Sequence, residues 1–240
     1  MLIFAHRGAS GYAPENTLAA MEKALELGVE AIELDIHAVE GELMVFHDRR
    51  LEGKSDGKGF IRHKTLAELS KVRVRGEAVP SLWQVLELTR GRCLVNIELK
   101  GQGTVAPLVP LYHRAIAELG FSPEQLLLSS FNHPYLAQLR QQLPKARLAP
   151  LLGSLPLDLA AVAGSLGAYS IHLDVDFISH AMVDDAHRRG VKVYVYTVDD
   201  ADEIQALRQL GVDGIFANYP DRAQAALAVA SVRDYGHWFD

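Results

Sequence analysis

Short apolar runs alternate along the chain with longer segments in which apolar residues recur every three or four positions. The short runs predict strands, and the longer segments have the period of one helix face and predict helices. Each predicted strand is followed by a predicted helix, and the strands lie near residues 2–6, 31–37, 93–99, 125–130, 146–151, 168–173, 191–197 and 213–217. Eight such α/β units favour a closed parallel barrel, the (β/α)₈ or TIM barrel.

The residues that flank the predicted helices agree with this division, because Asn, Ser and Asp cap helix N-termini and Gly ends helices. The pairs that bracket three of the helices are Asn16 with Gly28, Ser179 with Gly190, and Asp200 with Gly211. A doubly wound open sheet uses similar units, but it normally has a Gly-rich turn after its first strand. The segment His6–Gly11 lacks that glycine spacing, so we prefer the barrel.

One connection is much longer than the others. It joins the second and third predicted strands over residues 38–92 and contains the turn-rich segment 53–59. We expect a small insertion over one end of the barrel, at approximately residues 48–80. Two capping boxes each predict a short helix, and they are Thr65 with Glu68 and Ser81 with Gln84.

Composition and charge fit a single barrel domain over residues 1–240, since 49% of the residues are hydrophobic and no linker separates a second domain. The formal net charge is −6 with Lys and Arg scattered, so we expect a small-molecule substrate and neither nucleic acid nor an anionic membrane as partner. No run approaches the roughly 20 apolar residues of a membrane helix, and Met1–His6 is too short for a signal-peptide core. We therefore expect a cytoplasmic protein without membrane insertion.

The single cysteine and the C-terminal aromatic residues predict packing. Cys93 has no second cysteine to pair with, which excludes an intramolecular disulfide and a thiolate metal cluster and leaves a small buried apolar group. We expect the last ten residues, with Tyr235, Trp238 and Phe239, to pack on the body of the protein or on a neighbouring subunit. In the second case the protein would form a homodimer.

Two carboxylates in the second predicted strand are the strongest chemical signal. Glu33 and Asp35 are two residues apart, and the two-residue period of a strand turns both side chains to one face. Like charges so close inside an apolar barrel persist only with a cation, a base or a proton to offset them. A bound divalent ion is the simplest of these.

The third predicted strand repeats the alternation with Asn96, Glu98 and Lys100 on one face. Because the carboxyl ends of parallel barrel strands meet at the active face, we expect Glu98 to converge with Glu33 and Asp35. Three carboxylates form an all-oxygen cluster that suits one hard cation, Mg²⁺ or Ca²⁺. The alternative is a structural ion network in which these acids pair with Lys100 and with Arg7.

Two histidines lie near the same barrel end. His6 ends the first strand beside Arg7, and His47 follows a short apolar run that could return over the barrel mouth. Asp48, next in the chain, would then orient the His47 ring or cap a turn. A pair of histidines suits proton transfer near neutral pH.

Three further residues at predicted strand ends are candidates for the lining of a pocket. They are His172 at the end of the sixth strand, Tyr196 at the end of the seventh and Phe131 after the fourth.

Several short motifs occur in a fixed order over nearly the whole chain. They are His6–Gly8, Pro14–Thr17, Glu33–Asp35, His47–Asp48, Val79–Leu82, Asn96–Lys100, Ser129–Phe131 and Gly211–Ile215. Together these motifs resemble the glycerophosphodiester phosphodiesterase family, in its short cytoplasmic bacterial form. The resemblance implies a (β/α)₈ barrel that uses a divalent cation to hydrolyse glycerophosphodiesters, such as glycerophosphocholine or glycerophosphoethanolamine, to sn-glycerol 3-phosphate and an alcohol.

By motif position, the resemblance also implies roles for individual residues. The metal ligands would be Glu33, Asp35 and Glu98, the acid/base pair His6 and His47, the phosphate-contacting cations Arg7 and Lys100, and further substrate-site residues Glu15 and Asn16. From the family alone, His6 would be the base and His47 the acid. A cyclic phosphate intermediate and direct attack by water use the same groups, so both routes stay open.

The chain departs from the family pattern at two positions. Family members usually have Trp where Tyr196 stands and Asp where Asn218 stands. We expect neither departure to touch the metal or acid/base residues, although the loss of a negative charge at position 218 bears on substrate preference.

Three other functions compete with this one. A related phosphodiesterase that acts on lysophospholipids, or ends at a cyclic phosphate, would need an apolar patch at the mouth, and the polar segment 54–58 shows little sign of one. A glycosidase would use a carboxylate pair without a metal. A non-catalytic sensor of glycerophosphodiesters would lack a site residue, and none is missing.

Overall fold

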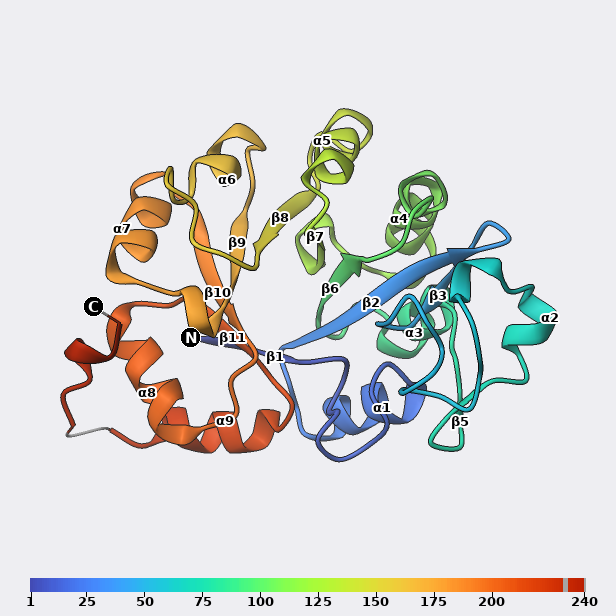
Figure 1. Ribbon diagram of the computed structural model, residues 1–240, viewed down its shortest axis with the longest axis horizontal. Helices are drawn as coiled ribbons and strands as arrows, with labels where there is room; N and C mark the ends of the chain where they lie inside the picture. The colour runs from blue at the N-terminus through green and yellow to red at the C-terminus, as the bar shows by residue number, and fades with distance from the viewer. Residues whose placement is uncertain (231–232, 240) are drawn as a thin grey trace.

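Within residues 1–230 and 233–239, which the computed structural model describes, eight parallel strands close into a barrel with helices around its outside (Figure 1). The order around the barrel is β1, β11, β10, β9, β8, β7, β6 and β2. Pairing of β1 with β2, through Phe4 with Ala31 and Ala5 with Ile32, closes the ring. The predicted fold class is therefore confirmed.

The barrel strands agree with the predicted ones to within about two residues at each end. They are β1 (Leu2–Ala5), β2 (Ala31–Val39), β6 (Leu94–Leu99), β7 (Leu126–Ser130), β8 (Arg147–Leu152), β9 (Ser170–Asp174), β10 (Lys192–Tyr196) and β11 (Gly214–Ala217).

Helices follow the strands as the apolar periodicity predicts. The α-helices are α1 (Leu18–Glu26), α2 (Leu66–Leu69), α3 (Leu82–Thr89), α4 (Val105–Leu119), α5 (His133–Gln142), α6 (Ala161–Ser165), α7 (His180–Arg188), α8 (Ala201–Leu210) and α9 (Pro220–Ala228). Four 3₁₀ turns are described, η1 (Ile61–His63), η2 (Pro123–Gln125), η3 (Val175–Phe177) and η4 (Gly236–Phe239).

The long connection after β2 begins as a hairpin. β3 (Glu42–Val45) pairs antiparallel with the end of β2, which brings the chain back towards the barrel mouth. The segment then forms η1, α2 and a small ribbon of β4 (Arg73–Val74) with β5 (Glu77–Ala78), and α2 lies at the right of Figure 1. It has an apolar cluster of its own, which includes Phe46, Leu51 and Ile61. An insertion with its own small core can hold side chains rigidly over the mouth.

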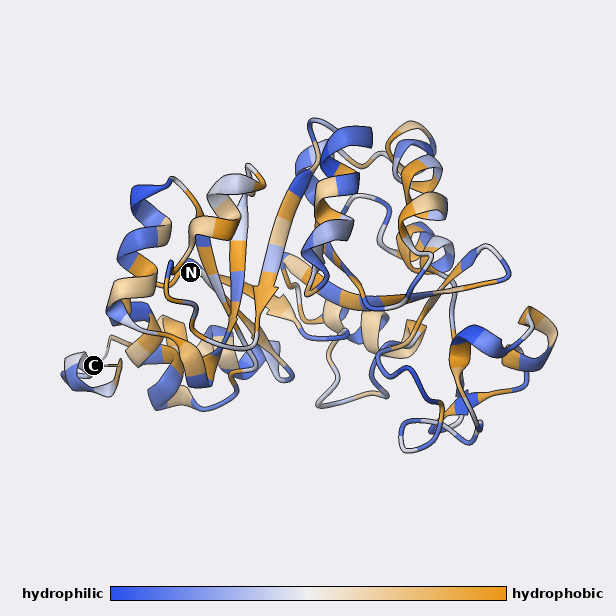
Figure 2. Cartoon of the chain, turned by 45° about the horizontal axis from the view of Figure 1, so that its top comes forward, coloured by the Kyte–Doolittle hydropathy of each residue, from blue (hydrophilic) through white to orange (hydrophobic). Residues whose placement is uncertain are grey.

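Buried apolar side chains form two layers. The colours of Figure 2 agree with this, because hydrophobic residues are frequent along the barrel strands and alternate with hydrophilic ones on the surrounding helices. One layer lies between the strands and the helices and contains Leu34 and Ile36. The other fills the barrel interior, where Phe4 stacks against Phe216 with ring centroids 4.6 Å apart. This interior plug forces polar residues of the strands towards the barrel ends.

The predicted helix starts are confirmed with one exception. Thr65 and Ser81 form the two capping boxes, and Ser179 and Asp200 cap α7 and α8. The prediction that Asn16 caps α1 is wrong, because Thr17 accepts the hydrogen bond from the Ala20 amide instead. Asn16 has a φ of 59° and turns its side chain into the barrel mouth. Asn16 therefore binds Asp35 at the barrel mouth, and Thr17 caps α1 in its place.

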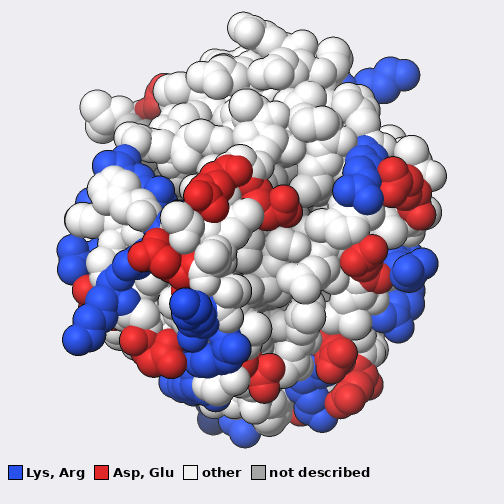
Figure 3. All heavy atoms as spheres, turned by 90° about the vertical axis from the view of Figure 1, so that its right-hand side faces the viewer, with Lys and Arg blue, Asp and Glu red and all other residues white. Residues whose placement is uncertain are grey.

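The surface and the C-terminal segment bear on the remaining expectations. The face that carries α2 shows Lys and Arg interspersed with Asp and Glu (Figure 3). Among the helices of the described residues, none has the length and apolar character to cross a bilayer.

Cys93 is buried and free, as predicted. Of the predicted tail, residues 231, 232 and 240 lie outside the described part, and Tyr235 is buried with its hydroxyl donating to Asp202 over 2.7 Å. The cytoplasmic location and the homodimer stay predictions.

Candidate active site

A tight turn after β1 presents the first two site residues. Arg7 and Gly8 both have left-handed φ values, 56° and 79°. A Cβ on Gly8 would lie 2.6 Å from the backbone carbon of Ala20, so only glycine lets α1 pack this close to the turn. The Arg7 backbone N–H donates to Glu33 Oε2 over 2.8 Å, which links the turn to β2.

Three carboxylates converge between β2 and β6. Asp35 and Glu98 are directly paired across the two parallel strands, and Glu33 lies one strand period before Asp35. One oxygen from each of Glu33, Asp35 and Glu98 lies within 4.8 Å of the others, and all three residues are buried. The expected convergence of these acids is present in the structure.

Burial and mutual repulsion perturb all three acids. Burial, with the charges of Asp35 and Glu98 beside it, raises the pKa of Glu33 well above its usual value. Burial and Asp35 raise the pKa of Glu98 to about 7. Burial acts in the same direction on Asp35, but Arg7 and Lys100 outweigh it and lower its pKa. The local positive charge therefore suffices to ionise one of the three acids fully.

The donor atoms around this cluster fit a hard cation. The three carboxylates supply oxygen ligands, the type that Mg²⁺ and Ca²⁺ prefer. Asn96 Oδ1 and Ser129 Oγ, both buried, have no hydrogen-bond partner among the described residues. Buried polar atoms are normally paired, so these oxygens add to the case for a polar occupant.

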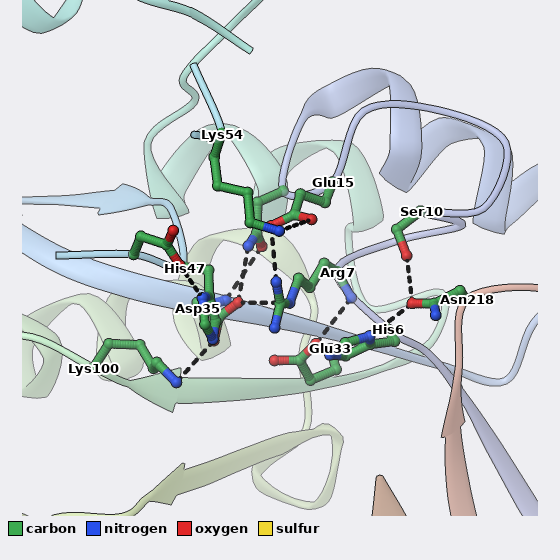
Figure 4. Close-up of polar contacts among 12 residues, drawn as sticks. His6, Arg7, Ser10, Glu15, Glu33, Asp35, His47, Lys54, Lys100 and Asn218 are labelled. Atoms are coloured by element: carbon green, nitrogen blue, oxygen red, sulfur yellow. Dashed lines mark hydrogen bonds and ion pairs between the residues drawn. The ribbon is translucent and has the colours of Figure 1, made fainter. Parts of the chain in front are cut away.

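Two basic side chains border the acids, as Figure 4 shows. Lys100 Nζ lies 2.9 Å from Glu98 and 3.9 Å from Asp35. Arg7 reaches Asp35 with its Nε at 3.4 Å and Glu15 with its Nη1 at 2.8 Å. Asn16 donates to Asp35 over 2.8 Å. The contacts of the alternative ion network are thus present, and the same groups also face a cavity.

His6 and His47 both border this cavity and have different partners. His6 Nδ1 lies 2.8 Å from Asn218 Oδ1, a neutral amide, and His6 Nε2 lies 4.0 Å from Glu33. His47, which β3 carries back over the mouth, has its Nδ1 2.5 Å from the carboxylate of Asp48. Burial and the charge of Arg7 lower the pKa of His6 to about 4. Burial also lowers the pKa of His47, and Asp35 partly offsets it.

The cavity has a volume of about 160 Å³ and is charged on one side and aromatic on the other. Phe131 and Tyr196 form the aromatic side, with ring centroids 6.1 Å apart, and the Tyr196 hydroxyl donates to the Leu152 carbonyl over 2.9 Å. His172 lies at the floor, fully buried, and burial lowers its pKa to about 3. It is therefore neutral and close to the interior rings, with its centroid 5.1 Å from that of Phe216.

Every residue proposed from the sequence lies at this end of the barrel, but not all border the cavity. Its lining includes His6, Arg7, Glu33, His47, Glu98, Lys100, Phe131, His172 and Tyr196. Asp35 and Asn16 lie behind it, bonded to each other, and Glu15 binds Arg7 from outside.

One expectation about the departures from the family pattern is wrong. Asn218 contacts His6 directly, and Tyr196 lines the same cavity. The reason is barrel closure, because Ala5 of β1 pairs with Ala217 of β11 and so places the residues that follow them side by side.

Sequence reasoning also missed residues that support the site. Lys54 of the insertion binds Glu15 over 2.9 Å, and Asp199 accepts from both the backbone and the side chain of Asn218. Ser10 donates to Asn218 over 2.8 Å. The turn-rich composition around Lys54 predicted a loop but no partner for it, since the contact spans 39 residues of sequence.

Comparisons with known proteins agree with this geometry. The family model described as "Glycerophosphoryl diester phosphodiesterase family" matches residues 6–222. A glycerophosphodiester phosphodiesterase of Caldanaerobacter subterraneus subsp. tengcongensis is 34% identical over 92% of this chain and 95% of its own length. One of Bacillus altitudinis is 32% identical over 92% and 96%.

A solved structure resembles most of the chain as well. It is a phosphodiesterase of Oleispira antarctica in complex with its product sn-glycerol-3-phosphate, 27% identical, with a TM-score of 0.86 over 95% of this chain and 97% of that one. The matches cover barrel, insertion and cavity alike. The chain therefore belongs to the glycerophosphoryl diester phosphodiesterase family, a family of enzymes.

Proposed function

We propose that this protein hydrolyses glycerophosphodiesters such as glycerophosphocholine and glycerophosphoethanolamine to sn-glycerol 3-phosphate and an alcohol. In this proposal it uses one divalent cation and a pair of histidines. The observation that carries the proposal is the convergence of three buried carboxylates, two basic side chains and two imidazoles at one barrel mouth. The product bound by the Oleispira antarctica phosphodiesterase supports the choice of substrate class.

The cation would be held by Glu33, Asp35 and Glu98. The raised pKa values of Glu33 and Glu98 support this assignment, because a positive ion among the three acids removes the repulsion that favours their protonation. When bound, a divalent cation supplies positive charge to the oxygens of a phosphodiester. Either Mg²⁺ or Ca²⁺ suits ligands of this kind.

Arg7 and Lys100 would stabilise the phosphate as the reaction proceeds. Negative charge grows on the non-bridging oxygens when a nucleophile approaches phosphorus, and both side chains line the cavity with their charges held by neighbouring acids. Positive groups fixed in advance stabilise that developing charge without having to reorganise.

The partners of the two histidines favour His6 as base and His47 as acid. An imidazole that accepts a proton must first be neutral, and His6 has a pKa of about 4 and an amide as its partner. An imidazole that donates a proton is helped by an anion that stabilises its charged form, and Asp48 is such an anion. His6 would take a proton from the glycerol 2-hydroxyl or from water, and His47 would give one to the departing alkoxide.

A second candidate substrate, a lysophospholipid, is favoured by one observation. Exposed apolar side chains follow the ends of three neighbouring strands, Phe131 after β7, Leu155 and Leu157 after β8, and Phe177 after β9. These residues lie outside the insertion, whose polar segment 54–58 shows little sign of an apolar patch. Strand ends in a parallel barrel share one face, so these residues and the cavity lie on the same side. An acyl chain could rest on them while the phosphate enters the cavity.

Phosphorus NMR of the products tests both candidates in one experiment. Incubation with glycerophosphocholine should give sn-glycerol 3-phosphate. Loss of the lysophosphatidylcholine signal with appearance of a new phosphorus signal would support the second candidate, and an unchanged spectrum would exclude it. Binding of glycerophosphocholine without any product would support a sensor and overturn the proposed hydrolysis. Full activity in the presence of a chelator would revive the metal-free alternative.

A further inference from the structure

A chain of hydrogen bonds connects an exposed acid to His6 through Asn218. The Asp199 carboxylate accepts two hydrogen bonds from Asn218, one from the side-chain Nδ2 over 2.6 Å and one from the backbone N–H over 2.7 Å. Asn218 Oδ1 lies 2.8 Å from His6 Nδ1, as the dashed contacts beside His6 in Figure 4 show. None of these bonds belongs to the acid cluster or to the phosphate-binding cations.

The direction of each bond in this chain is determined by chemistry. A carboxylate only accepts hydrogen bonds, so Asp199 must face the NH₂ group of Asn218. The amide oxygen then faces His6 and can only accept, which requires a hydrogen on Nδ1 of the imidazole. The Ser10 hydroxyl also reaches Asn218 Oδ1, but a hydroxyl can donate or accept and so imposes no direction.

We propose that Asp199 and Asn218 are positioning residues that hold neutral His6 in the tautomer with hydrogen on Nδ1 and a free lone pair on Nε2. The lone pair then lies on the nitrogen that faces Glu33 and the cavity, at 4.0 Å from the Glu33 carboxylate. A base needs its lone pair on the side of the proton it takes, so this tautomer is the productive one. The expected effect of this tautomer on turnover rests on the proposed function. The tautomer itself follows from the hydrogen bonds alone.

The decisive variant is Asp199→Asn, because Asp199 lies outside the cavity lining and forms hydrogen bonds to Asn218 and Tyr219, which also lie outside it. Its new amide can keep accepting the backbone N–H groups of Asn218 and Tyr219 with its oxygen, which leaves its NH₂ facing the NH₂ of Asn218. Turning the Asn218 amide over relieves this conflict and presents an N–H to His6 Nδ1. The imidazole must then carry its hydrogen on Nε2.

Nitrogen NMR of histidine-labelled protein reads the tautomer directly, and the His6→Ala spectrum identifies the resonances. At about pH 8, where neutral imidazole predominates, wild-type His6 should show a protonated Nδ1 and Asp199→Asn a protonated Nε2. We expect kcat to fall by about 10²- to 10⁴-fold with little change in KM, as for a general base held in the wrong tautomer.

Two matched variants complete the test. Asp200→Asn makes the same charge change one residue along and keeps a cap for α8, so tautomer and kcat should stay as in wild type. In the double variant Asp199→Asn with Asn218→Asp, the new amide can donate to the new carboxylate, and that carboxylate can accept from His6. The hydrogen on His6 Nδ1 should therefore return. Asn218→Asp alone is not a suitable control, because it places two carboxylates in contact. An unchanged tautomer in Asp199→Asn, or a wild-type His6 protonated on Nε2, overturns this inference. Retained activity in His6→Ala would instead overturn the proposed function and leave the tautomer result standing.

Discussion

The two sides of the barrel mouth are built from different kinds of side chain. On the side of β1, β2 and β6, the strand ends carry charged residues that pair in a dense network, with Arg7 and Lys100 among the acids. On the side of β7 to β10, the two aromatic residues Phe131 and Tyr196 face the cavity, and exposed apolar side chains follow the ends of β7, β8 and β9. Both sides come from the same alternation of strand and helix.

The difference shows how one barrel end can divide the recognition of a substrate. Charged groups bind a phosphate and the ion beside it with defined geometry, whereas apolar side chains bind by shape and give modest discrimination. Substitutions on the charged side should therefore abolish the reaction, and those on the aromatic side should change which substrate is preferred.

The largest effect should come from removal of divalent cations. Chelation should abolish release of sn-glycerol 3-phosphate from glycerophosphocholine, because it removes the cation that Glu33, Asp35 and Glu98 would hold and with it the positive charge that would act on the phosphodiester. Activity should return on addition of Mg²⁺ or Ca²⁺, and the ion that restores more of it is the better match to the site. Turnover that survives exhaustive chelation would contradict this expectation.

Substitution of either histidine should come next. We expect His6→Ala and His47→Ala each to lower kcat by about 10²- to 10⁴-fold, because each removes one proton transfer. Circular dichroism and the melting temperature should stay near those of wild type, since neither side chain belongs to an apolar cluster. His63→Ala, in the insertion and outside the cavity, is the matched control and should keep wild-type turnover. An active His6 or His47 variant with a native spectrum would exclude that residue from the reaction.

The crowded acids should also make the metal-free protein sensitive to pH. The pKa of Glu98 rises from an ordinary 4.5 to about 7 on folding, so between these values the folded state holds more protons than the unfolded state. The free energy of unfolding should therefore be highest below about pH 4.5 for this group and fall by about 1–3 kcal/mol as pH rises to 7.

Denaturant titrations in chelator at pH 5 and at pH 7 measure this drop. It should be smaller in Glu98→Gln, which cannot titrate, and a saturating divalent cation should also reduce it. An equal drop in wild type and Glu98→Gln would show that Glu98 is ionised normally.

The smallest effects should come from the aromatic side. Phe131→Ala should lower kcat/KM for glycerophosphocholine by about 5- to 30-fold, the loss of one hydrophobic contact. Leu157→Ala removes a fully exposed side chain and should leave that substrate unaffected. If lysophosphatidylcholine is hydrolysed, Leu157→Ala should lower its kcat/KM selectively. Equal losses for both substrates would show that Leu157 does not distinguish them.

Local rules were enough to predict much of the site. The two-residue period of a strand placed Glu33 and Asp35 on one face, and the same period placed Glu98 and Lys100 on one face of the third strand. Both patterns depend only on neighbours in the chain. The return of His47 over the mouth also followed from a local signal, a short apolar run after Gly41.

Local rules failed where a contact joins distant parts of the chain. Asn218 and His6 are 212 residues apart, and Lys54 and Glu15 are 39 apart. No periodicity connects such pairs, and only the closure of the barrel and the packing of the insertion bring them together. The same limitation concealed the apolar side chains at the mouth, which come from three separate loops.

By itself, the sequence determined the alternation that favours a barrel, the positions of its strands and the acids that share a face, because backbone periodicity and burial act over a few residues. Only the tertiary structure decided the partner of each histidine, the orientation of the Asn218 amide and the division of the mouth into charged and aromatic sides. Hydrogen bonds require atoms within about 3 Å, and only the closed fold brings atoms from opposite ends of the chain to that distance.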